Sequence, residues 1–414
     1  MALDLAALAR SLDGAGEVRE AGDDDVVDGV PASVVARPTS VEGVSAVLRE
    51  ATGQGLVTVA RGAGTALGWG SPPERVDLIL DVGGLDRLVE HEAGDLVVVA
   101  EAGLPLKALQ ETVGRAGQEL VADVPRERYE AGSTIGGALA TAATGPRRLQ
   151  RLALRDLVLG ATVVLADGTV ATSGGKVVKN VAGYDLAKIM TGSYGTLGVI
   201  VRAAFRLHPV RPARGFVVRT GPLEVVADLA REVVGSQLAP AAVELDRAAG
   251  SDEATLAVLL DGTADAVAAR AAQTAALVSG EVADAPSWWA HLPGGDVLAK
   301  TTATLTGVKA LLIAARVSEQ RRGGAVALRG SAVGVLHAGI TAPDAASVAG
   351  VVADLRATAP SPREGTVVVL RASRELRDGL DVWGPVGGLD LMRGIKEQLD
   401  PGRNLAPGRF VGGI

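Results

Sequence analysis

The chain has 414 residues, of which 48% are hydrophobic, 21% are charged and 2% are aromatic, and its formal net charge is −7. This length allows two or three domains with substantial cores, whereas the acidic balance and the few aromatic residues argue against a nucleic-acid-binding surface. The absence of cysteine excludes disulfides, cysteine nucleophiles, cysteinyl flavin links and thiolate-ligated iron–sulfur clusters. The four histidines are widely spaced, which argues against a local metal site.

Residues 1–29 are expected to form an N-terminal helix and extension. The first sixteen residues read MALDLAALARSLDGAG, with an acid at position 4 and no basic residue before the apolar stretch, so no signal peptide is predicted. No apolar run approaches the roughly 18–20 residues that a membrane-spanning helix needs. We expect a cytoplasmic protein without a direct membrane span, which a membrane-bound partner could still hold.

A helix, a strand and a glycine-rich loop follow one another at 38–68. Residues 38–54 predict an amphipathic helix with Thr39 or Ser40 as its N-cap, and residues 56–60 predict a strand. The loop RGAGTALG then follows at 61–68. Closely spaced glycines allow backbone N–H groups to point at an anion without obstruction by Cβ atoms, which suits a pyrophosphate. A purely structural turn is the alternative.

A Rossmann loop for NAD is the obvious interpretation of this pattern, and Asp81 even lies where a ribose-binding acid would be expected. However, a Rossmann loop must lead directly into a helix. Residues 69–75 read WGSPPER, and the paired prolines leave no room for a helix before the strand predicted at 76–82. The pattern therefore favours a phosphate-binding loop of another fold.

The region 131–208 combines small residues with strand signals. After a helix predicted at 104–117, the run GSTIGGALAT at 132–141 allows close approach of either a flat ligand or a packed helix. An Asp-Gly turn at 167–168 between β-branched runs predicts a hairpin. The stretch GGKVVKNVAGYDLAKIMTGSYGTLGVI at 174–200 then leads into a strand predicted at 197–207.

A domain boundary is predicted at the proline- and arginine-containing stretch 208–215. Beyond it, short strands alternate with helices, which predicts an α+β domain with helices on one face of an antiparallel sheet. The expected domains are 30–209, 210–390 as a C-terminal cap or substrate domain, and 391–414 as a tail that returns to the first domain.

The order of these motifs resembles the FAD-binding domain of the vanillyl-alcohol oxidase / p-cresol methylhydroxylase (PCMH) superfamily. The resemblance rests on RGAGT, GSTIGGALATAATGPRR, LRDLVLGATVVLADGTV and the stretch 174–200, and on the tail LDPGRNLAPGRF. Within that superfamily the chain is similar to the FAD-binding subunits of bacterial glycolate oxidases, in which a P-R-R and a K-N-V-A-G-Y-D-L block are characteristic. The resemblance implies a two-subdomain FAD-binding domain followed by an α+β cap.

The resemblance also implies which residues hold the cofactor. The first loop would bind the FAD pyrophosphate through backbone amides, the small-residue run would line the pyrophosphate and ribityl chain from the opposite side, and the end of the third stretch would contact adenine or flavin. The implied residues are Arg61, Gly62, Ala63, Gly64, Thr65, Ala66, Leu67, Gly132, Ser133, Thr134, Gly136, Gly137, Thr141, Val199 and Ile200. Thr65 stands where relatives with covalently bound flavin often carry histidine, so noncovalent FAD is expected.

Relatives that oxidise 2-hydroxy acids transfer hydride to flavin, which needs a cation for the substrate carboxylate and a base for the hydroxyl proton. Many carry H-x-G-D-G-N in the second domain, but this chain reads HAGIT at 337–341 and has no metal-ligand partner for that histidine. The candidate catalytic residues are His337, Arg329, Arg371 and Lys179. An ordinary strand-end histidine and solvated arginines are the alternatives.

The sequence therefore predicts an FAD-dependent oxidoreductase subunit that oxidises a short 2-hydroxy acid such as glycolate. Its electrons must leave for oxygen, a quinone or a partner, and the resemblance implies a second flavin subunit and an iron–sulfur subunit. Two alternatives stay open: a stand-alone 2-hydroxy-acid dehydrogenase, and a non-catalytic assembly subunit.

Overall fold

The computed structural model describes residues 4–176, 185–377 and 379–414. They form two compact units. The first contains the residues up to Ala143, Ala153–Val210 and Gly388–Ile414, and the second contains Thr144–Leu152 and Arg211–Gly387. The tail 391–414 belongs to the first unit. Residues Thr144–Leu152, which include the P-R-R residues, belong to the second unit. The domain predicted from the sequence at 30–209 includes them, because nothing in their composition marks a boundary.

The first unit contains a small mixed sheet, and the glycine-rich loop follows its edge strand β5. Its strand order is β1-β4-β6-β5, and β4 and β5 both run parallel to β6. Helix α2 begins after Ser40, whose hydroxyl accepts the Gly43 N–H at 3.0 Å. The elements are α1 (Leu5–Ser11), β1 (Gly16–Glu20), β2 (Val26–Val27), β3 (Val30–Pro31), β4 (Val34–Pro38), α2 (Val41–Gly53), β5 (Thr58–Arg61) and β6 (Leu78–Asp81).

A second, antiparallel sheet of the first unit has the order β11-β10-β12-β8-β7. The predicted hairpin is confirmed, because β10 and β11 pair antiparallel up to Val164 and Val170 around the Asp167-Gly168 turn. The elements are β7 (Leu88–Glu92), β8 (Val97–Glu101), α3 (Leu106–Gly114), β9 (Gln118–Glu119), α4 (Arg126–Glu130), α5 (Ile135–Ala140), α7 (Leu154–Leu157), β10 (Val158–Val164), β11 (Val170–Gly174), α8 (Leu186–Met190), β12 (Val199–Arg206), β13 (His208–Pro209) and α14 (Leu389–Leu399).

One apolar core joins the two sheets of the first unit. Val199 and Val201 of β12 pack in the same cluster as Val44 and Val47 of α2, together with Leu405 of the C-terminal tail. The loop after β5 and the helix α5 are therefore carried by two sheets that share a core. This shared core holds the two glycine-rich segments in a fixed relation to each other.

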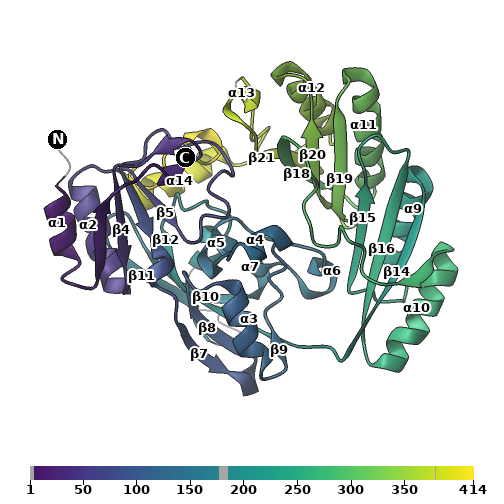
Figure 1. Cartoon of the computed structure of the whole chain (residues 1–414), viewed down its shortest axis with the longest axis horizontal. Coiled ribbons are helices and arrows are strands. Elements are labelled where there is room, and N and C mark those ends of the chain that lie inside the picture. Colours follow the sequence, from purple (N-terminus) through teal and green to yellow (C-terminus); the bar gives the residue numbers. More distant parts are fainter. Residues whose placement is uncertain (1–3, 177–184, 378) are drawn as a thin grey trace. The chain divides into compact units, whose positions relative to one another are not determined.

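The second unit is an eight-stranded sheet with helices on one face (Figure 1). Its order is β17-β14-β16-β15-β19-β20-β18-β21, antiparallel throughout, and its apolar core lies between the sheet and helices α9–α12. The elements are α6 (Arg148–Arg151), β14 (Ala213–Pro222), α9 (Leu223–Gly235), β15 (Ala242–Arg247), β16 (Glu253–Gly262), α10 (Ala264–Val278), β17 (Glu281–Ala283), β18 (Val297–Ala303), α11 (Gly307–Arg322), β19 (Ala325–Ser331), β20 (Val335–Thr341), α12 (Ala345–Arg356), β21 (Gly365–Arg371) and α13 (Arg374–Arg377).

This architecture confirms the predicted α+β fold class with an antiparallel sheet in the C-terminal part. Every second residue of β16, namely Ala254, Leu256, Val258 and Leu260, lies in the core between the sheet and the helices. Among the helices that the structure describes, none combines the length and the apolar character needed to cross a bilayer.

A buried ion pair ties α11 to the sheet of the second unit. Arg247 is fully buried, donates to the Val326 carbonyl at 2.7 Å and pairs with Glu319 of α11. The Glu319 carboxylate also accepts the N–H groups of Val326 at 2.6 Å and Gly250 at 2.9 Å. Removing one member of such a pair leaves a buried charge without its counter-charge.

We therefore predict that Glu319→Gln lowers the free energy of unfolding of the second unit by about 3–5 kcal/mol, because the Arg247 charge stays buried. Urea unfolding at neutral pH measures the change. Glu253→Gln, at an exposed position of β16, is the control and should change stability by less than about 0.5 kcal/mol. Equal stability of the Glu319 variant and the wild type would contradict this account.

Candidate functional site

A pocket in the first unit lies between the glycine-rich loop and α5. It contains about 510 Å³ of empty space, part of which opens to solvent. The lining residues come from β5, the loop after it, α4, α5, the turn before β12 and the C-terminal tail. They are Val59, Ala60, Arg61, Gly62, Ala63, Gly64, Thr65, Ala66, Leu67, Arg128, Thr134, Gly137, Ala140, Thr141, Tyr194 and Arg409.

The glycines of the loop are required by close approach and by backbone conformation. A Cβ atom on Gly62 would lie 2.3 Å from the Thr134 hydroxyl oxygen, so the backbone at this position packs directly against the residue that caps α5. Gly64 has φ +74°, a left-handed conformation that favours glycine. Both glycines belong to the part of the loop that lines the pocket.

Arg128 of α4 brings a buried positive charge to this wall. The residue is 5% exposed, and its guanidinium lies 4.5 Å from the centre of the Trp69 ring. One terminal nitrogen donates to the Thr141 hydroxyl at 3.2 Å, but Nη1 has no hydrogen-bond partner among the described residues. Burial lowers the pKa of Arg128 to about 10, so the group stays charged at neutral pH. A buried, incompletely partnered cation indicates an anionic ligand.

Arg409 and Tyr194 complete the polar part of the pocket. Arg409 is 3% exposed and donates from Nη2 to the Trp69 carbonyl at 2.9 Å. Burial raises the pKa of Tyr194 to about 12, so its phenol is neutral at physiological pH and can donate a hydrogen bond. No aspartate or glutamate is among the described residues that line the pocket.

The side chain of Arg61, in contrast, does not add net charge to the pocket. Its guanidinium pairs with Asp25 at 2.8 Å and with Asp81 at 3.2 Å. Asp25 also pairs with Arg19 at 2.6 Å and accepts the Gly22 N–H at 2.9 Å. The charge of Arg61 is therefore neutralised by carboxylates, and its role is to hold the first residue of the loop in place.

The donor set fits the diphosphate of a dinucleotide. Two buried guanidinium groups face a loop of backbone amides, and the lining contains no acidic side chain that would repel an anion. The missing side chain of Gly62 lets the loop pack against Thr134 at the start of α5, which keeps both segments at the pocket. A family model described as an FAD binding domain matches residues 32–174, which include the loop, Arg128 and α5. Residues 32–174 of this chain are thus similar to FAD binding domains.

Two curated relatives and one solved structure match this chain in part or in full. The D-lactate dehydrogenase of Archaeoglobus fulgidus is 35% identical over 51% of this chain and 46% of its own. The glycolate oxidase subunit GlcE of Escherichia coli is 39% identical over 34% of this chain and 39% of its own. The chain thus spans less than half of the length of either relative. A p-cresol methylhydroxylase structure with substrate bound shares the fold at a TM-score of 0.73 and 16% identity, covering 98% of this chain and 95% of that one.

The expected cofactor residues of the FAD-binding domain divide into two groups. All residues of 61–67 line the pocket, as do Thr134, Gly137 and Thr141. Gly132, Ser133 and Gly136 do not line it. A Cβ on Gly136 would lie 2.8 Å from the Ala102 side chain, so this glycine serves the packing of α5 against the residue that follows β8.

Val199 and Ile200 also lie away from the pocket. Their backbones pair with Val164 and Val163 of β10, and their side chains lie in two separate cores. Their expected contact with adenine or flavin stays a prediction. Lys179 lies outside the described residues, whereas Lys176 pairs with Glu90 and Lys188 with Asp185.

The other catalytic candidates lie in the second unit, His337 and Arg329 on the adjacent strands β20 and β19, and Arg371 on the edge strand β21. His337 of β20 is in register with Arg329 of β19 on one side and with Lys300 of β18 on the other. Arg329 is paired with Asp246 at 2.7 Å and lies against the Trp288 ring. Burial and the Lys300 ammonium lower the pKa of His337 to about 3, so the imidazole is neutral and a weak base. Arg371 is exposed at the end of β21.

Lys300 is the cation in this row that sequence reasoning missed. Burial, with a further contribution from the Arg148 charge, lowers the pKa of Lys300. Arg148 belongs to the P-R-R segment, which the fold brings to the second unit. Within the described part of the chain, no carboxylate forms an ion pair with Lys300. The strand register that places Lys300 beside His337 has no signal in the sequence.

Arg128, Tyr194 and Arg409 were also missed as cofactor residues. Arg128 lies on the short helix just before the small-residue run, and Arg409 lies in the tail sequence APGRF. Neither has a periodic pattern around it, and only the fold brings the two arginines to the same loop. Their position next to glycine-containing motifs is the single sequence signal that could have indicated them.

We predict that Arg128→Met weakens FAD binding about 10- to 100-fold, because it removes a charge-assisted hydrogen bond to the diphosphate. Quenching of flavin fluorescence on titration of the apoprotein measures the dissociation constant. Arg126→Met is the matched control, since Arg126 lies on the same helix with an exposed side chain paired to Glu130. If the two variants bind FAD equally well, Arg128 does not contact the cofactor.

The Asp25 cluster gives a pH-dependent prediction. Hydrogen bonds from Arg19 and then from Arg61, opposed by burial, hold the pKa of Asp25 well below its usual range. Because the folded pKa is lower than the unfolded one, near 4, the stabilisation is complete above pH 4 and is lost as the pH falls towards the folded value.

Asp25→Asn should therefore lower stability by about 1–3 kcal/mol at pH 7, and the difference from wild type should shrink below pH 4. Urea unfolding between pH 7 and pH 2.5 tests this. Asp24→Asn, at the exposed neighbouring position, should show no such dependence. A difference that is constant with pH would rule out the ionised Asp25 as the stabilising group.

Proposed function

We propose that the pocket binds FAD noncovalently and that the chain is the FAD-binding subunit of a complex that oxidises a short 2-hydroxy acid to the 2-oxo acid. The observation that carries the proposal is the buried, incompletely partnered Arg128 beside the glycine-rich loop. Noncovalent binding is supported by the absence of histidine in 61–67 and of cysteine in the whole chain. The names of the relatives, a D-lactate dehydrogenase and a glycolate oxidase subunit, support the substrate class.

In this proposal the protein residues at the pocket bind and orient the cofactor. Backbone amides of 61–67 and the guanidinium groups of Arg128 and Arg409 neutralise the diphosphate, and the neutral Tyr194 phenol donates a hydrogen bond. Bound FAD would supply the acceptor for the hydride, which carries the two electrons of the alcohol oxidation. Because Arg61 is neutralised by Asp25 and Asp81, it positions the loop without competing for the diphosphate.

The substrate groups are assigned to the second unit. The Lys300 ammonium is proposed to bind the substrate carboxylate, and neighbouring His337 is proposed to accept the hydroxyl proton. With a pKa of about 3, His337 alone is a poor proton acceptor. A carboxylate beside Lys300 offsets the ammonium charge and thereby favours protonation of His337. Arg329, already held by Asp246, is proposed to orient this row of side chains and not to clamp the substrate.

Electrons are proposed to pass to partner subunits in the cytoplasm, one with a second flavin and one with an iron–sulfur cluster. The cysteine-free chain cannot hold a thiolate-bound cluster itself. The low pKa of His337 favours one alternative, a flavin-containing assembly subunit without its own turnover. A stand-alone 2-hydroxy-acid dehydrogenase is the other, favoured by the similarity to the D-lactate dehydrogenase.

Anaerobic addition of glycolate or D-lactate to the FAD-loaded chain, alone and then with its co-purified partners, tests these functions. Bleaching of the flavin absorbance by the chain alone supports its own catalysis. Bleaching only with partners present, combined with loss of the complex when this chain is omitted, supports the assembly role. A purified chain that shows no flavin absorbance, and none after FAD is added, overturns the proposal.

Lys300→Met tests the substrate assignment. We predict that it raises KM for the hydroxy acid about tenfold or more, with a smaller effect on kcat, because it removes a charge-assisted contact present before and during the reaction. Lys309→Met is the matched control in the same unit, since Lys309 is paired with Asp228 at 2.6 Å on the surface. An unchanged KM in the Lys300 variant would exclude Lys300 from the substrate site.

A further inference from the structure

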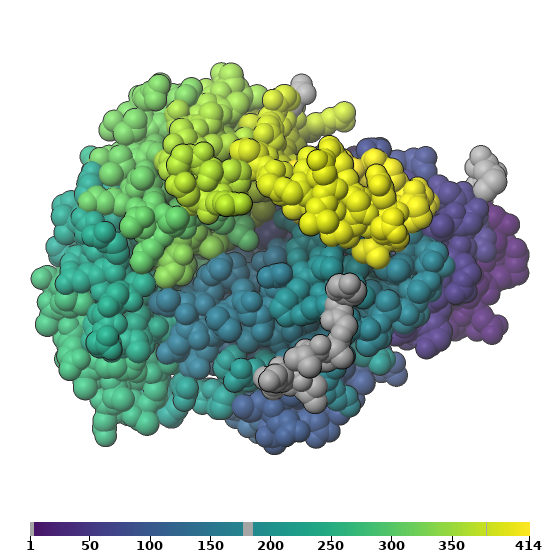
Figure 2. Space-filling view, turned by 180° about the vertical axis from the view of Figure 1, so that it is seen from behind, coloured from purple at the N-terminus to yellow at the C-terminus, as the bar shows by residue number. Residues whose placement is uncertain are grey.

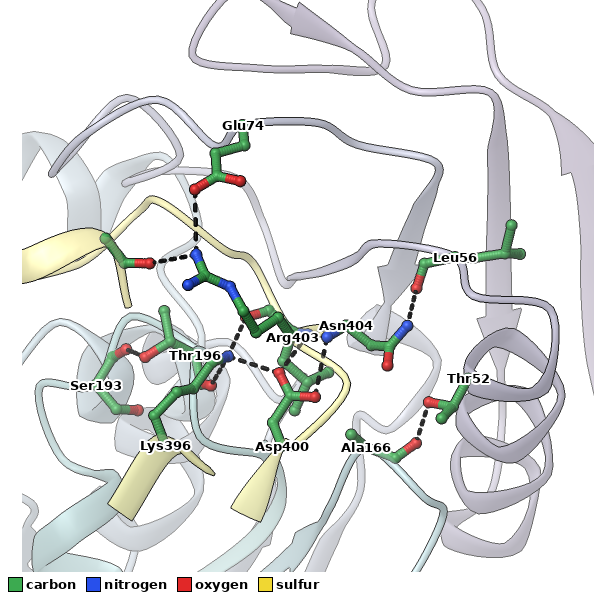
Figure 3. A network of polar contacts seen from close by, with 12 residues as sticks. Thr52, Leu56, Glu74, Ala166, Ser193, Thr196, Lys396, Asp400, Arg403 and Asn404 are labelled. Atoms are coloured by element: carbon green, nitrogen blue, oxygen red, sulfur yellow. Dashed lines mark hydrogen bonds and ion pairs between the residues drawn. The ribbon is translucent and has the colours of Figure 1, made fainter. Parts of the chain in front are cut away.

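A lysine is buried at the last turn of α14, where the C-terminal tail begins. Lys396 is 5% exposed, and its ammonium donates to three oxygens, the Thr196 carbonyl at 2.7 Å, the Leu405 carbonyl at 2.8 Å and the Asp400 carboxylate at 2.6 Å (Figure 3). Its three donors are therefore all used. The three acceptors come from the turn before β12, from the tail and from the end of the helix itself.

Asp400 completes the buried ion pair and holds the tail backbone. Its carboxylate, which is fully buried, accepts the N–H groups of Asn404 at 2.9 Å and Leu405 at 2.8 Å. The Asn404 side chain then donates to the Leu56 carbonyl at 3.0 Å (Figure 3). Lys396 and Asp400 thus fold residues 400–405 into one conformation and present them to the strand that leads to the glycine-rich loop.

The tail pairs directly with that strand. The Thr58 N–H donates to the Asn404 carbonyl at 2.7 Å, and the Ala406 N–H donates to the Thr58 carbonyl at 3.0 Å, which makes a parallel bridge between Thr58 and Leu405. Thr58 is the first residue of β5, and the last residue of β5 is Arg61. The tail therefore supports the base of the loop on the side away from β6.

Beyond this bridge, the tail reaches the cofactor pocket itself. The Ser71 N–H donates to the Arg409 carbonyl at 3.2 Å, while Arg409 Nη2 donates to the Trp69 carbonyl at 2.9 Å. Gly70 has no room for a side chain, because a Cβ atom there would lie 2.9 Å from the Arg409 carbonyl oxygen. The Arg128 guanidinium in turn lies over the Trp69 ring. The tail thus contacts the pocket and also buttresses one of its two arginines.

On its other side, Lys396 holds the turn that contains Tyr194. The Thr196 carbonyl accepts from Lys396, and the Thr196 hydroxyl donates to the Ser193 carbonyl at 2.7 Å. Tyr194 lies between these two residues and lines the pocket. One buried ammonium therefore links the tail to two walls of the cofactor site, although it does not itself line the pocket.

We propose that Lys396 and Asp400 are positioning residues for the FAD site, and that docking of the C-terminal tail and binding of FAD are thermodynamically coupled. The inference rests on FAD binding in the pocket, as proposed above. The docked tail supplies Arg409 and fixes Trp69, so a chain with an undocked tail binds the cofactor less tightly. By reciprocity, bound FAD must hold the tail in its docked state by the same factor.

Figure 2 shows the tail as a yellow segment on the surface of the molecule, accessible along one side. Arg403, in the middle of the tail, has a side chain 56% exposed, and it pairs with Glu74 at 3.2 Å. Cleavage after Arg403 by trypsin requires the backbone around it to leave its bonds with Asp400 and Thr58. The rate of this cleavage therefore reports the undocked fraction of the tail.

The first experiment measures the FAD dissociation constant of the full chain by flavin fluorescence quenching. Lys396→Met is expected to weaken FAD binding about tenfold or more, although Lys396 does not line the pocket. Asn404→Ala, which removes one tether to Leu56 without leaving a buried charge, is expected to weaken it about three- to tenfold. Glu319→Gln breaks a buried ion pair of the second unit and is the matched control, with FAD affinity expected within about twofold of wild type.

The second experiment uses the wild-type chain alone and needs no variant to fold. Saturating FAD is expected to slow tryptic cleavage after Arg403 at least about fivefold. Mass spectrometry of the released tail measures the rate. Cleavage after Arg321, whose side chain is 65% exposed in the second unit, should keep its rate.

The outcomes separate the two proposals. Wild-type protein that binds no FAD overturns the proposed cofactor site. If wild type binds FAD but both tail variants match it within about twofold, or if FAD leaves cleavage after Arg403 unchanged, the coupling is overturned while the cofactor site stands.

Discussion

The burial of positive charge beside a glycine-rich loop is the constraint on which the first unit depends. Arg128 and Arg409 lie at the wall of one pocket, both less than a tenth exposed, and no carboxylate lines that pocket among the described residues. A guanidinium is costly to bury unless its donors are used. Thr141, Trp69 and the backbone use some of them, and the remaining capacity matches a diphosphate held by loop amides.

The carboxylates near this pocket form ion pairs that hold the segments around it. Asp25 and Asp81 hold Arg61 at the start of the loop, and Asp400 holds Lys396 at the start of the tail. In both cases an ion pair fixes a backbone segment that contacts the cofactor pocket, while the paired charges themselves are neutralised. The two buried arginines that line the pocket, Arg128 and Arg409, are held by segments whose own charges are paired.

The second unit presents a different electrostatic situation. Its row of side chains on β15, β19, β20 and β18 begins with the pair Asp246–Arg329 and ends with His337 and Lys300. The ammonium and burial both favour the neutral imidazole. If the proposed substrate roles hold, an anion must lie at Lys300 before proton transfer to His337 becomes favourable. This ordering is a physical reason why catalysis by this chain would depend on the substrate carboxylate.

The sequence by itself determined the glycine-rich loop at 61–67, the rejection of a Rossmann fold, the Asp-Gly hairpin and the α+β class of the C-terminal part. These follow from local rules, because glycine spacing, paired prolines and strand alternation act within a few residues of each other. Only the tertiary structure decided which charges serve the cofactor. Arg128, Tyr194 and Arg409 are far apart in sequence, and a shared core and the C-terminal tail bring them to one loop. Lys300 and His337 likewise come together only through the register of their strands. Residues 144–152 belong to the second unit, although the chain on both sides of them belongs to the first. Such long-range placement depends on which apolar faces pack together, and no local pattern in the chain records it.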